Sequence, residues 1–152
     1  MGRTLGGAIE PGTITDADFS NDTSKNLTGA KQRHVYRGWT NFDLAIAGTP
    51  VTREEIVFCA KQAGTIRGFR CVLNDSGTST SITFDLKKNG TTILTGVATI
   101  VHGTGDRIFV NGTLASDTFV ADDVFSIAMT VSSSTGAQGP YAEAFFEENL
   151  AP

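Results

Sequence analysis

The stretch SITFDLKKNGTTIL, residues 81–94, decides the fold of this chain. Within it, Ile82, Phe84 and Leu86 alternate with polar residues, so the apolar side chains fall on one face of an extended segment. A period of two predicts a strand with one buried face and one solvated face, as in antiparallel sheets.

A tight turn is predicted directly after this strand. Asn89-Gly90 is the strongest short-range hairpin signal in the chain, because a two-residue type I′ turn needs a positive φ at both central residues. A second alternating run follows at residues 124–131, so we expect a common core. Its predicted members are Phe84, Leu86, Phe125, Ile127 and Met129.

Short strand-like runs continue through residues 34–149, separated by turn signals such as residues 74–77 and 136–140. This spacing predicts an all-β fold, an antiparallel β-sandwich that we expect to be a jelly roll. The expected body spans residues 34–152. No segment carries a helical stripe of useful length.

Residues 1–33 differ from the body because they show neither sustained alternation nor a helical stripe. We interpret them as an extended N-terminal arm that lies along neighbouring subunits or a larger assembly. Its expected contact residues are the isolated apolar side chains Leu5, Ile9, Ile14, Phe19 and Leu27.

The composition excludes two classes of partner. Charged residues make up 18% of the chain and the net charge is −4, without a basic stripe that would bind nucleic acid. No apolar run approaches the length needed to span a membrane, so we expect no membrane partner.

Residues with catalytic potential are few, and we predict that the chain is not an enzyme, with no catalytic, cofactor-binding or metal site. His34 and His102 are the only histidines, and no nucleophile motif accompanies them. Cys59 and Cys71 lack histidine partners at metal-binding spacing. We expect buried free thiols, with a disulfide across neighbouring strands as the alternative.

Three aromatic residues are candidates for contact with a ligand or a partner. Tyr36, Trp39 and Tyr141 could form a platform for a sugar, since such rings offer large, rigid contact areas. The alternative, which we favour, places them in the core or in a subunit interface.

Five segments follow one another along the chain in a recognisable order. A polar leader, residues 11–19, precedes a His-containing segment, residues 31–36. A stretch at 66–69, a hairpin at 84–91 and a late strand at 123–127 then follow. This order of segments resembles small virion proteins of tailed phages and prophages.

This resemblance implies a jelly-roll-like body, often trimeric, that serves as a head decoration (cement) protein. The expected partners are the major capsid protein and other copies of the chain, and the expected location is the virion head surface after synthesis in the host cytoplasm. The alternative is a receptor- or carbohydrate-binding module of a tail or head fibre. The resemblance supplies no catalytic residue.

Overall fold

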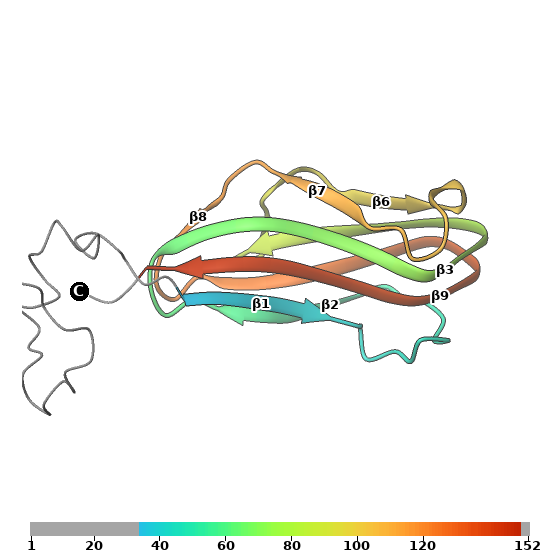
Figure 1. The fold of residues 1–152 in the computed structure, drawn as a ribbon, viewed down its shortest axis with the longest axis horizontal. Coiled ribbons are helices and arrows are strands. Elements are labelled where there is room, and N and C mark those ends of the chain that lie inside the picture. The colour runs from blue at the N-terminus through green and yellow to red at the C-terminus, as the bar shows by residue number, and fades with distance from the viewer. Residues whose placement is uncertain (1–33, 150–152) are drawn as a thin grey trace, which may run out of the picture. The chain divides into compact units, whose positions relative to one another are not determined.

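The computed structural model describes residues 34–149 (Figure 1). Nearly all of its regular structure is antiparallel strand. The elements in chain order are β1 (His34–Thr40), β2 (Arg53–Cys59), β3 (Gly64–Lys88), β4 (Thr91–Thr92), β5 (Leu94–Gly96), β6 (Ala98–Val101), the 3₁₀ turn η2 (His102–Thr104), β7 (Val110–Leu114), β8 (Thr118–Phe119) and β9 (Val124–Glu148).

The central feature is a ribbon made of β3 and β9, the two longest strands. They pair antiparallel along nearly their whole length, from Gly64 opposite Glu148 to Lys88 opposite Phe125. In Figure 1 both strands curve over at the same end and run back, so one half of the ribbon lies in front of the other.

Glycines allow this bend. Gly77 in β3 and Gly136 and Gly139 in β9 have φ values of 65°, 76° and 60°, a region that L side chains rarely adopt. A Cβ on Gly139 would lie 2.5 Å from the Ile46 carbonyl oxygen, so the close approach of the neighbouring loop also requires glycine here.

The bent ribbon creates two layers, each extended by flanking strands. The front layer consists of β1, the second half of β9, the first half of β3, and β7. The back layer consists of β2, the first half of β9, the second half of β3, and β6. The predicted antiparallel β-sandwich is confirmed, whereas this strand order does not confirm a jelly roll.

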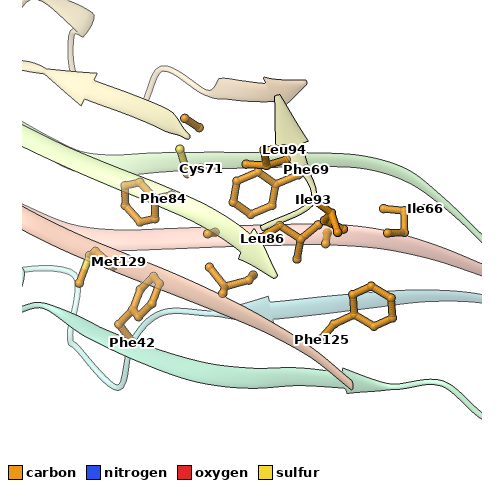
Figure 2. Packing of buried hydrophobic residues seen from close by; sticks show 14 of the residues in the cluster. Phe42, Ile66, Phe69, Cys71, Phe84, Leu86, Ile93, Leu94, Phe125 and Met129 are labelled. Carbon is orange, nitrogen blue, oxygen red and sulfur yellow. The ribbon is translucent and has the colours of Figure 1, made fainter. Parts of the chain in front are cut away.

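The core lies between the layers (Figure 2). All five predicted core residues are confirmed, since none is more than 1% exposed: Phe84, Leu86, Phe125, Ile127 and Met129. At the end opposite the bend, Phe125 packs against the rings of Phe119 and Phe146, with centroids 5.5 and 4.8 Å apart. The alternation in the sequence therefore predicted correctly which face of each of these two strands is buried.

The Asn89-Gly90 turn is confirmed, because Lys88 pairs with Thr91 and both turn residues have positive φ. Two other predicted turns were wrong as strand boundaries. Residues 74–77 and 136–140 lie inside β3 and β9, where they bend a paired ribbon instead of reversing the chain. Glycine and small polar residues are common both where a chain reverses and where a paired strand bends, so residue type does not separate the two cases.

The domain prediction for residues 1–33, with the arm contacts Leu5, Ile9, Ile14, Phe19 and Leu27, lies outside the described residues. The side chain of His34 lies outside them as well.

We expect Phe125→Ala to lower the free energy of unfolding by about 3–5 kcal/mol, because it removes a fully buried ring from an aromatic cluster. Urea denaturation followed by circular dichroism measures this change. Ile56→Ala is the control, since Ile56 is 70% exposed and its loss should change stability by about 0.5 kcal/mol or less. Similar losses in both variants would contradict this assignment of the core.

Candidate functional site

The outward faces of the two layers differ in chemistry. The back layer presents polar side chains and isolated aliphatic ones such as Ile56, and its Glu54 carboxylate accepts hydrogen bonds from Lys87 at 2.7 Å and Ser126 at 2.5 Å. The hydrogen bond from Lys87 is the main cause that lowers the pKa of Glu54. The front layer instead presents aromatic rings and arginines, and so it is the candidate binding surface.

We call this surface the aromatic–arginine face. Strand pairing aligns its members, with Glu143 of β9 between Trp39 of β1 and Arg70 of β3, and Phe145 opposite Arg37. Its residues are Arg37, Trp39, Arg70, Phe109, Tyr141, Glu143 and Phe145.

Glu143 organises the face because its carboxylate is almost completely buried, with the residue 1% exposed. Tyr141 donates a hydrogen bond to Oε2 at 2.7 Å, and Arg37 Nε lies 3.3 Å from the same oxygen. Arg70 forms an ion pair with Oε1. A buried carboxylate is stable only with such partners, so these three side chains are held in place.

Tyr141 stays a neutral donor at ordinary pH. Burial raises the pKa of its hydroxyl, and the hydrogen bond to Glu143 raises the pKa further. The phenol therefore keeps its proton pointed at the carboxylate across the neutral range.

The rings stack on this charged centre. The Arg70 guanidinium lies 4.2 Å from the Phe109 centroid and 5.4 Å from that of Phe145, within the range of a cation–π contact. Trp39 stacks on Tyr141 with centroids 6.2 Å apart. Trp39 is nevertheless 55% exposed and Phe109 43% exposed, so both rings are available to a partner.

A pocket of about 360 Å³ opens beside this charged centre. A bulge between Ile66 and Gly68 interrupts the register of β3 with β9 there. Arg67, which forms an ion pair with Glu147, lies on the rim beside Arg70. The lining residues are Arg67, Gly68, Phe69, Arg70, Asn111, Gly112 and Phe145.

The structure brings together two of the three predicted aromatic residues. Trp39 and Tyr141 share the aromatic–arginine face. Tyr36 instead lies on the other side of β1 and packs against Phe58, with ring centroids 5.4 Å apart. The sequence reasoning missed the role of Arg70 and Phe145. Alternation of Tyr141, Glu143 and Phe145 along β9 was the signal that could have identified this face.

A serine, a histidine and an aspartate meet at the bent end of the ribbon, but their bonding is structural. The Ser76 hydroxyl donates to Asp106 at 3.0 Å, and the Ser76 amide donates to the same carboxylate at 2.8 Å. The backbone bond lowers the pKa of Asp106. Nδ1 of His102 contacts the Gly77 carbonyl oxygen, so the ring is not oriented by the aspartate, and the cluster fastens the η2 loop to the bend.

Residues 34–149 contain no group of three His, Cys, Asp or Glu side chains that could hold a metal ion. In the same range, no helix is long and apolar enough to cross a membrane.

The two cysteines are free, and they differ in accessibility. Cys71 is buried in the core, and burial raises the pKa of its thiol to about 12. Cys59 is exposed, so the expectation of two buried thiols was wrong for this residue. It ends β2, where its side chain points away from the core.

Comparisons with known proteins identify no relative: no family model, curated protein or solved structure matches the chain.

One thiol per folded chain should react with a maleimide at pH 7. Cys59 is accessible, whereas Cys71 is shielded and remains protonated far above neutral pH. Mass spectrometry of the labelled protein gives the count, and the Cys59→Ser variant should remain unlabelled until it is unfolded in urea. Rapid labelling of both thiols in the folded protein would contradict the burial of Cys71.

Replacing the buried carboxylate, Glu143→Gln, should lower the free energy of unfolding by about 1–2 kcal/mol. Both arginine partners lose their counter-ion, but they are partly exposed and can be rehydrated. Glu54→Gln on the back layer is the matched control, because the 41% exposed Glu54 side chain should contribute less than about 1 kcal/mol. Urea denaturation compares the two, and equal losses would show that Glu143 does not organise its face.

Proposed function

We propose that this chain is a non-catalytic attachment protein that binds a partner protein through its aromatic–arginine face. Following the sequence resemblance, we assign it as a capsid decoration protein on the head of a tailed phage, with the major capsid protein as the partner. The observation that carries the proposal is the group of exposed rings and arginines fixed on the front layer.

The residue types support attachment to a protein. Aromatic residues and arginine are enriched at the centres of protein interfaces and supply most of the binding energy there. Trp39 projects from β1 and Phe109 from the residue just before β7, and Glu143 holds Arg37 and Arg70 in one arrangement. A rigid surface of this kind loses little conformational entropy when it binds.

The chemistry of the histidine cluster supports a non-catalytic role. The Ser76 hydroxyl donates a hydrogen bond to Asp106, and the His102 ring contacts a backbone carbonyl oxygen, so the histidine is not placed as the base of a Ser–His pair. Assembly as a homotrimer, with the N-terminal arm reaching a neighbouring subunit, remains part of the proposal and follows from the resemblance alone.

Capsids that lack the protein provide the test. Full-length protein should co-sediment with such capsids, and Trp39→Ala or Phe109→Ala should weaken binding by about 10- to 30-fold, as expected for a residue at the centre of an interface. Pelleting across a concentration series gives the dissociation constants.

Ile56→Ala is the matched control, because Ile56 is also an exposed apolar residue but lies on the back layer. Its binding should equal that of the unmodified protein. Absence of co-sedimentation would overturn the capsid assignment, and equal weakening by all three variants would overturn the choice of face.

A further inference from the structure

We propose that the pocket beside Arg67 and Arg70 is a binding site for an acidic sugar, a pyranose ring that bears a carboxylate. This inference goes beyond attachment to a capsid and does not depend on it. It rests on the shape, the charge and the lining of the pocket.

The hollow exists because of one bulge and one glycine. The register shift between Ile66 and Gly68 places Gly68 opposite Phe145, two positions before the outward-facing Arg70. A side chain at position 68 would project between Arg67 and Arg70, but glycine leaves that space open. A Cβ there would meet Phe145 at 3.8 Å, an ordinary contact, so the fold itself does not demand glycine.

The charge around the pocket favours an anion although the chain as a whole is acidic. The lining holds two arginines, Arg67 and Arg70, and no carboxylate, because their partners Glu147 and Glu143 lie outside it. The ion pair of Arg67 runs through Nε, and a guanidinium carries four further N–H donors on its terminal nitrogens. The planar arrangement of these donors matches a carboxylate.

The position of Arg70 is fixed before a ligand arrives. Glu143 holds Arg70 from one side, and the rings of Phe109 and Phe145 lie close to its guanidinium. Arg67 forms an ion pair with Glu147, and its side chain is 51% exposed, so it can adjust to the ligand. Because Arg70 is already ordered, a small ligand can bind with little loss of conformational entropy at that side chain.

Size and lining favour a sugar over an acidic side chain of a protein. The volume of about 360 Å³ is at the lower end of the range for small-molecule sites and exceeds what one carboxylate would fill. The exposed Asn111 offers a donor and an acceptor for ring hydroxyls. Phe145 provides an apolar surface for the C–H groups of a sugar ring.

Paired sugars that differ only in the carboxylate test the proposal. Glucuronate and galacturonate are titrated into the full-length, ¹⁵N-labelled protein, with glucose and galactose as their neutral counterparts. We expect the acidic sugars to shift the amide signals of Gly68, Arg70 and Asn111, and to bind at least about tenfold more tightly than the neutral sugars.

Two glycine variants locate the binding site. Gly68→Val should fill the pocket and abolish these shifts. Gly96→Val is the matched control, because a Cβ at exposed Gly96 meets nothing within 4 Å and lies outside the pocket. Thermal denaturation of both variants establishes that they are folded. Arg67→Ala should weaken binding of acidic sugars about tenfold, and Arg67→Lys should restore part of it.

Several results would overturn the inference. Equal binding of glucuronate and glucose would remove the role of charge, and shifts that survive Gly68→Val would place the sugar elsewhere. A hexaglutamate peptide that shifts the same amide signals and binds more tightly than either acidic sugar would assign the pocket to a protein carboxylate. Capsid co-sedimentation is measured separately, so failure here leaves the attachment proposal to its own test.

Discussion

The continuous pairing of β3 with β9 is the constraint on which the rest of the structure depends. The two strands bend together at Gly77 and at Gly136 and Gly139, so one ribbon supplies the centre of both layers. The flanking strands only extend what this ribbon defines. Because alternation continues on either side of the bend, apolar residues face inward in both layers. The outward positions are then free to differ between the layers.

The front layer uses that freedom to hold a buried charge. Glu143 occupies an outward position of β9, yet the residues around it cover the carboxylate almost completely. Covering a carboxylate costs free energy unless donors surround it, and here Tyr141, Arg37 and Arg70 supply them. The same donors carry the rings of the face, through the Trp39–Tyr141 stack and the contacts of Arg70 with Phe109 and Phe145. Charge burial and ring placement are therefore one arrangement.

Alternation at residues 82–86 and 125–131 was sufficient to predict these two strand segments and their buried faces, because burial of alternate residues is a local property of sequence. The spacing of the turn signals then indicated the sandwich. The turn at Asn89-Gly90 was predictable for the same reason. The bend was not predictable, since glycine at position 77 or 136 allows either a reversal or a continued strand, and only long-range pairing decides. The candidate site depends on that pairing as well. Trp39 and Tyr141 could be nominated from residue type, but the alignment of Arg70 with Glu143 depends on strand register.

The folded ribbon also has a consequence for how the chain reaches its native state. The Arg70–Glu143 contact joins residues 73 positions apart, and the Asn89–Val124 bond joins residues 35 positions apart. Closing such long segments costs entropy before any pairing energy returns, so chains dominated by distant contacts cross their folding barrier slowly. Since one ribbon serves both layers, neither layer has a centre of its own to form first. Refolding is therefore expected to be slow and to occur in a single cooperative step.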